Sequence, residues 1–300
     1  MGCHKHFLHG RKLESRVTIS IRSISSDRSD CGEGPIWNPE TKVISWVDIA
    51  GSKWHQNSLE KSSISRTFVV PTIIGAIVER ASGGYLAAVK EGFAFLDMKE
   101  NYSCVIDFLP KDQRMNDAKV DSKGRFWAGS TAIDFSPGQG KLHLLFPDMS
   151  MRVMETGLTL PNGLGWSPDN RSFYLVDSMT KMMWRYDFDE DSGKISNREL
   201  MVRFADDGGL PDGLTVTDEG LIIVAMWDGS RLEVFAPNGE RITTISMPVK
   251  RPTSCTFAGD KLIVTSAAGE QDLNEYPLSG LTLVVEGLPY EGQASAVFNG

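Results

Sequence analysis

The sequence predicts an all-β fold, a six-bladed β-propeller whose ring is closed by an N-terminal strand, and three observations support this prediction. A short motif recurs from Glu33 to Ser254 at steps of 42, 41, 46, 50 and 42 residues, which is the length of a propeller blade of about four short strands. Within each repeat, apolar and polar residues alternate between turn-forming residues, as they do in β-strands. No long helical period competes, because Pro161 and Gly163 interrupt the apolar stretch 155–166.

Each repeat opens with small or polar residues and continues through an apolar strand and a charged turn into a second strand. The turns have typical compositions, such as Ser-Pro-Asp-Asn at 167–170 and Asp-Glu-Gly at 218–220. The six openings, in order, are Gly34–Trp37, Gly75–Val78, Asn116–Val120, Asn162–Trp166, Asp212–Val216 and Thr253–Phe257.

The segment 16–23 precedes the first repeat and alternates like a strand. We expect it to complete the last blade, because closing the ring removes the open edges of the sheets. Residues 16–300 are therefore predicted to form one domain, and residues 1–15 a flexible tail.

Composition excludes several classes of protein. The net charge of −8, with no basic stripe, argues against nucleic-acid binding. No apolar run approaches ~18 residues, so no membrane helix is expected, and the first ten residues are too polar for a signal peptide. The four cysteines lack metal-site or disulfide spacing. We therefore expect a cytoplasmic protein of undetermined oligomeric state.

The residues that open the repeats indicate where chemistry takes place, because the innermost strands of a propeller begin together at one mouth of the central channel. These positions hold Glu33, Asn116, Asn162 and Asp212. Two carboxylates and two carboxamides drawn together repel one another unless a cation joins them. Oxygen ligands suit Ca²⁺, Mg²⁺ or Mn²⁺, and Zn²⁺ with open positions remains an alternative. The simpler interpretation is that these residues cap turns.

Other features have plainer interpretations. Neither a Gly-x-Ser-x-Gly elbow nor a glycine-rich phosphate loop is present, so a serine hydrolase has no nucleophile. Trp37 and Trp166 on first strands, and Trp46 and Trp127 on second strands, are expected to pack between blades. Trp227 comes later in its repeat and could approach the channel mouth, but packing between blades is favoured there too.

Five ordered motifs resemble those of the gluconolactonase, regucalcin (senescence marker protein) and luciferin-regenerating enzyme family. The resemblance runs from about residue 17 to about residue 292. The motifs are Gly32–Trp37, Arg114–Asp121, Pro161–Asp169, Leu210–Leu214 and Arg251–Cys255.

The family resemblance implies a six-bladed propeller with a single divalent metal held by Glu33, Asn162 and Asp212. It also implies that Arg114 and Asn116 face the substrate. Two positions depart from the family pattern. Asp134 stands where the animal regucalcins have a Glu, so it is a candidate substrate ligand with a shorter reach, and Ala118 stands where a Gly is usual.

The implied activity is the metal-dependent opening of a sugar lactone to its hydroxy acid. The metal would act as a Lewis acid, Asp212 as the general base, and Arg114 and Asn116 as substrate-gripping groups. For Arg114 the alternative is a surface charge that pairs with Asp112 or Asp117. Three other functions remain open: a calcium-binding regulatory propeller with little turnover, a lactonase or esterase acting on a non-sugar lactone, and an interaction scaffold.

Overall fold

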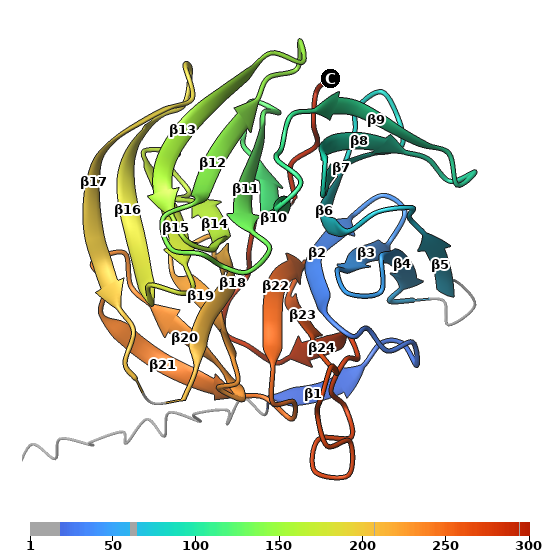
Figure 1. Ribbon diagram of the computed structural model, residues 1–300. Coiled ribbons are helices and arrows are strands. Elements are labelled where there is room, and N and C mark those ends of the chain that lie inside the picture. The colour runs from blue at the N-terminus through green and yellow to red at the C-terminus, as the bar shows by residue number, and fades with distance from the viewer. Residues whose placement is uncertain (1–18, 61–64, 207, 294) are drawn as a thin grey trace, which may run out of the picture.

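The computed structural model describes residues 19–60, 65–206, 208–293 and 295–300. The expected tail over residues 1–15 lies outside these residues. The described residues form six four-stranded antiparallel sheets arranged as blades around a central channel, with their outer strands at the rim (Figure 1). The predicted six-bladed β-propeller is therefore confirmed.

The first blade comprises β2 (Gly32–Asn38), β3 (Val43–Asp48), β4 (Lys53–Ser58) and β5 (Ser65–Val69). The second comprises β6 (Ile74–Glu79), β7 (Tyr85–Val89), β8 (Gly92–Leu96) and β9 (Tyr102–Asp107). The third comprises β10 (Gln113–Val120), β11 (Phe126–Ala132), β12 (Gly140–Leu145) and β13 (Met151–Leu158). The fourth comprises β14 (Pro161–Trp166), β15 (Ser172–Asp177), β16 (Met182–Asp189) and β17 (Lys194–Arg203). The fifth comprises β18 (Leu210–Val216), β19 (Ile222–Trp227), β20 (Arg231–Phe235) and β21 (Arg241–Ser246). The sixth comprises β22 (Pro252–Ala258), β23 (Lys261–Ser266), β24 (Leu283–Glu286) and the N-terminal strand β1 (Ser20–Ser23).

The ring is closed by β1, which pairs antiparallel with β24 from Ser20 opposite Glu286 to Ser23 opposite Leu283. The first described strand of the chain thus completes the last blade, as predicted. This pairing covers the edge that β24 would otherwise expose.

The hydrophobic core is divided among the interfaces between blades. Among the described residues, one cluster of buried apolar side chains lies between each pair of neighbouring blades. Trp37 and Trp46 pack between the first and sixth blades, and Trp127 and Trp166 between the third and fourth. These four tryptophans therefore have the structural role predicted from the sequence.

The innermost strand of every blade is interrupted by a shift of register near its start. Such bulges redirect side chains at the point where pairing is broken. The interrupted segments run between Glu33 and Ile36, Ile74 and Ala76, Met115 and Ala118, Pro161 and Leu164, Pro211 and Leu214, and Pro252 and Cys255. The polar residues that open the repeats therefore lie in or beside the bulges.

Glycine in these bulges lets neighbouring inner strands approach closely. A Cβ atom added at Gly163 would lie 2.5 Å from both the carbonyl oxygen of Asp212 and the amide nitrogen of Leu214. A side chain at this position would push β14 away from β18. The Asn-Gly pair at 162–163 therefore serves two purposes: the asparagine faces the channel, and the glycine brings the next blade near.

Candidate metal centre

A cavity of about 210 Å³ opens at the channel mouth where the inner strands begin. Its polar lining comes from the starts of β2, β10, β14 and β18, together with Ser178 after β15. Five of the six site residues predicted from the sequence line it, namely Glu33, Arg114, Asn116, Asn162 and Asp212.

Glu33, Asn162 and Asp212 come from three different blades and are all at least nine-tenths buried, with 6%, 6% and 5% of their surface exposed. The Asn162 side-chain amide donates hydrogen bonds to Asp212 Oδ1 and, over 3.1 Å, to Ser178 Oγ. These bonds leave Asn162 Oδ1 buried without a hydrogen-bond partner. An unpartnered buried oxygen beside two carboxylates is a position that a cation would satisfy.

The two carboxylates are destabilised as anions when no cation accompanies them. Burial raises the pKa of Glu33 well above its usual value, and Asp212 and Asp117 raise it further. The pKa of Asp212 is likewise raised well above its usual value, first by burial and then by Asp117. A divalent cation between these groups would favour their charged forms.

The donor set fits a hard divalent cation, since it offers two carboxylates and one amide oxygen. Among the described residues, no group of three or more His, Cys, Asp or Glu side chains forms a metal cluster. The amide of Asn162 is therefore essential to a three-oxygen site. Such a set matches Ca²⁺, Mg²⁺ or Mn²⁺ better than a structural zinc site.

Arg114 adds a positive charge to the site. It was not among the repeat-opening residues that were predicted from the sequence to converge at the channel mouth. Its Nη1 donates to Asn116 Oδ1 at 2.7 Å and to the Met115 carbonyl at 3.0 Å, so it lies at the cavity instead of forming a surface pair. Burial lowers the pKa of Arg114, while Cys31, Glu33 and Asp212 oppose that effect. Asn116 is held in turn by its amide, which donates to the Pro161 carbonyl at 3.0 Å.

Asp134 is not brought to the cavity with the others. Its side chain is exposed and accepts hydrogen bonds from the Ser136 amide at 3.0 Å and the Ser136 hydroxyl at 2.8 Å. These bonds lower the pKa of Asp134. The next residue, Phe135, lines the cavity in its place and has a left-handed backbone conformation with φ of 56°.

The apolar wall of the cavity was not among the features predicted from the sequence. Trp227, for which packing between blades was favoured, is only partly buried and lines the cavity. The members of this wall share a position along the chain but not a residue type. Ile49, Phe135 and Met179 closely follow the second strands of their blades, and Trp227 ends one. Antiparallel pairing places the end of each second strand beside the start of the first strand, near its polar residue. For example, Leu210, two residues before Asp212, lies opposite Trp227.

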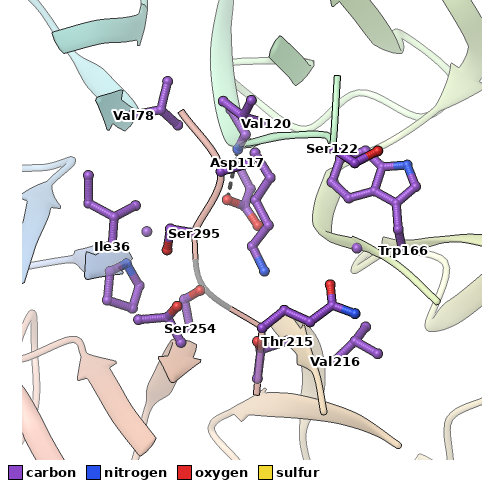
Figure 2. Close-up of a pocket in the computed structure, with 18 of the residues that line it drawn as sticks. Ile36, Val78, Asp117, Val120, Ser122, Trp166, Thr215, Val216, Ser254 and Ser295 are labelled. Carbon is purple, nitrogen blue, oxygen red and sulfur yellow. Dashed lines mark hydrogen bonds between the residues drawn. The ribbon is translucent and has the colours of Figure 1, made fainter. Parts of the chain in front are cut away.

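A second cavity of about 540 Å³ lies on the other side of the bulges. Figure 2 shows its residues around the channel, with Asp117, Ser254 and Thr215 labelled. Asp117 is adjacent to Asn116, yet it lines this second cavity, as does Lys119, whose Nζ donates to the Leu214 carbonyl. The bulge therefore directs consecutive side chains into two different cavities.

Comparisons with known proteins agree with this architecture. The sequence profile of the SMP-30/Gluconolactonase/LRE-like region matches residues 31–268. The chain belongs to this family. Its relatives include regucalcin of Danio rerio, 35% identical over 92% of this chain and 97% of that protein. Human regucalcin is 32% identical over 94% of this chain and 99% of that protein.

Solved structures share the same fold. A luciferin-regenerating enzyme superposes with a TM-score of 0.88 at 26% identity, over 94% of this chain and 100% of that one. A calcium-binding protein, regucalcin from Agrobacterium tumefaciens, gives a TM-score of 0.88 at 22% identity, over 94% and 98% of the two chains. Family membership supports a lactonase-like or regucalcin-like function. Within the described part of the chain, no helix has the length and apolar character needed to cross a membrane.

Proposed function

We propose that the protein is a metal-dependent lactonase, which hydrolyses the ring ester of a lactone to the open hydroxy acid. The supporting observation is the convergence of Glu33, Asn162 and Asp212, with an unpartnered buried oxygen on Asn162, in a cavity that also holds Arg114 and Asn116. The resemblance to gluconolactonases makes an aldonolactone the first substrate to test.

Glu33, Asn162 and Asp212 would hold one divalent cation, with Ca²⁺, Mg²⁺, Mn²⁺ and Zn²⁺ as candidates. Such a cation supplies Lewis-acid stabilisation of negative charge on the carbonyl oxygen. The remaining steps belong to the side chains of the protein.

In this proposal Asp212 moves the proton. Its Oδ1 accepts a hydrogen bond from the side-chain amide of Asn162. This bond orients the Asp212 carboxylate as a general base. As the base, Asp212 removes a proton from the attacking water while the water oxygen bonds to the lactone carbonyl carbon. When the bond from that carbon to the ring oxygen breaks, Asp212 returns the proton to the departing alkoxide.

In this proposal Arg114 and Asn116 orient the substrate. The hydrogen bond between Arg114 Nη1 and Asn116 Oδ1, at 2.7 Å, holds both side chains at the cavity. The other guanidinium N–H groups can donate to the lactone carbonyl or to a ring substituent. Holding the ring ester against Asp212 in this way reduces the entropy cost of the reaction.

A calcium-binding regulatory protein with little turnover is the second candidate, because one structural neighbour is named a calcium-binding protein, regucalcin. It would use the same three ligands. Loss of metal therefore does not separate the two functions, but turnover does.

Protein stripped with a chelator is expected to lose at least about 90% of its lactonase activity and to regain it when one divalent cation is added. The measurement is acid release from a panel of aldonolactones, alkyl lactones and aryl esters, repeated with each cation. Cation binding without turnover of any lactone would favour the calcium-binding function. Turnover that survives complete metal removal would contradict the metal-dependent mechanism.

Divalent cations are expected to raise the melting temperature more at about pH 8 than at about pH 5. The pKa values of Glu33 and Asp212 are raised in the folded, cation-free protein above their usual 4.5 and 3.8. The folded chain then holds protons that the unfolded chain releases, so cation-free stability falls as pH rises above those usual values. A bound cation replaces these protons and offsets the loss. Thermal melts with and without cation measure this, and an equal shift at both pH values would contradict it.

A further inference from the structure

The wall of the candidate cavity is mostly apolar. Charged and amide groups lie only at its floor, where the inner strands begin. Around them stand side chains from the first, third, fourth and fifth blades. They are Ile49, Phe135, Leu160, Met179, Leu210, Pro211 and Trp227.

Few polar groups remain for a substrate that carries many hydroxyls. Ser178 Oγ already accepts the Asn162 amide at 3.1 Å, and the carboxylate of Asp134 turns to Ser136. Asn116 is engaged through its oxygen by Arg114 and through its amide by the Pro161 carbonyl. Away from Arg114, Asn116 and Ser178, hydroxyls of a sugar ring would lose water along the apolar wall without gaining protein partners, which disfavours binding.

The aromatic part of the wall is held in place from behind. The Arg251 guanidinium lies 4.7 Å from the centre of the Trp227 ring. Arg251 is itself fixed by Asp228 Oδ1 at 2.8 Å and by the Gly269 carbonyl at 2.7 Å. Trp227 therefore presents a preorganised apolar surface, which binds an apolar group at a lower entropy cost.

The size of the cavity suits a small substrate. Its volume of about 210 Å³ is below the range of about 300–1,000 Å³ that accommodates drug-sized ligands. One lactone ring with a short substituent suits this volume better than a long acyl chain.

From these observations we infer that the preferred substrate is a small lactone bearing a short alkyl or fused aryl substituent, with the ring ester at the polar floor and the substituent against Trp227, Phe135 and Met179. This inference rests on the proposed lactonase function and names its substrate class. It replaces the polyhydroxylated sugar lactone that the family resemblance implies.

The test compares kcat/KM for matched lactones, using metal-loaded protein. The panel contains δ-valerolactone, its methyl, propyl and heptyl derivatives, dihydrocoumarin, and glucono-1,5-lactone. We expect kcat/KM to rise about tenfold from the unsubstituted ring to the propyl derivative, as apolar contacts are added, and to fall again for heptyl. Glucono-1,5-lactone should be at least about tenfold poorer than the propyl compound. A sugar lactone that outperforms every alkyl lactone would overturn the inference.

A variant of the wall tests which residues select the substituent. Met179 is 45% exposed, so Met179→Gln should fold normally while placing an amide in the wall. The preference for propyl over the unsubstituted ring is expected to fall about fivefold, mainly through KM. Met98→Gln is the matched control, because Met98 is 40% exposed and lies outside the cavity lining. Equal preferences in the two variants would contradict the assignment of this wall.

Failure of the inference can be separated from failure of the proposed function by a binding measurement. Calorimetry with propyl-substituted δ-valerolactam and with gluconolactam reports binding without requiring hydrolysis. Suppose that no lactone is turned over but the propyl lactam binds at least about tenfold more tightly than gluconolactam. This result would support the inferred ligand class and contradict the lactonase function. If gluconolactam binds as tightly as the propyl lactam or more tightly, or if neither lactam binds, the inferred substrate class is contradicted.

Discussion

Replacing Asp212 with Asn is expected to lower kcat on the best lactone by about 10³-fold or more. General-base catalysis by a positioned side chain contributes about 10²–10⁴-fold, and this carboxylate is also expected to hold the cation. Asn is nearly isosteric with Asp, so the buried hydrogen bonds around residue 212 can largely persist. Initial rates at saturating substrate and cation measure the effect.

Two further variants show whether Asp212 acts on the proton or only holds metal. Glu33→Gln removes a proposed ligand but no proposed base, so high cation concentrations should restore most of its kcat. Asp212→Asn should remain inactive under the same conditions. Asp218→Asn is the matched control, because Asp218 is exposed and lines the second cavity. Recovery of Asp212→Asn by added cation would rule out the role as base.

Asp121→Asn is expected to destabilise the fold by about 3–5 kcal/mol, because it breaks a buried ion pair by removing one charge. Asp121 Oδ2 accepts from Arg125 Nε at 2.6 Å and from Trp127 Nε1 at 2.9 Å. The Arg125 guanidinium also donates to the carbonyls of Glu190 and Asp191. The pair thus joins a turn of the third blade to a hairpin of the fourth.

The comparison for this prediction is an ion pair at the surface. Arg185 and Glu199 lie 2.5 Å apart, with 40% and 61% of their side chains exposed, whereas those of Arg125 and Asp121 are 4% and 0% exposed. Glu199→Gln should cost no more than about 1 kcal/mol. Urea unfolding measures the free energy of unfolding of both variants, and an unchanged m-value shows that their midpoints can be compared directly. Similar midpoints for the two would show that the buried pair does not stabilise the junction between the blades.

The polar residues at the floor of the site were predictable because the opening residue of each repeat lies at the same mouth of the channel. Glu33, Asn116, Asn162 and Asp212 recur at the blade period, and the bulged inner strands all begin at the same channel mouth. Counting repeats therefore located these residues before any side chain was placed.

The apolar wall was not predictable in this way, because its members share a position but not a residue type. Ile49, Phe135, Met179 and Trp227 lie at or just after the ends of second strands, where the repeat prescribes no particular side chain. Similarly, nothing in the residue type of Asp134 shows that Ser136 holds its carboxylate away from the cavity. The direction of a loop side chain depends on local hydrogen bonds that sequence periodicity does not encode.

By itself, the sequence determined the propeller, its six blades, its closing strand and the inner-strand positions of the candidate site, because each follows from a repeated local pattern. Only the tertiary structure decided which consecutive residues line different cavities, as Asn116 and Asp117 do. It also decided which loops supply the substrate wall. These features depend on the bulges and on contacts between residues far apart in the chain, such as Arg125 with Glu190, and such contacts form only when neighbouring blades pack against each other.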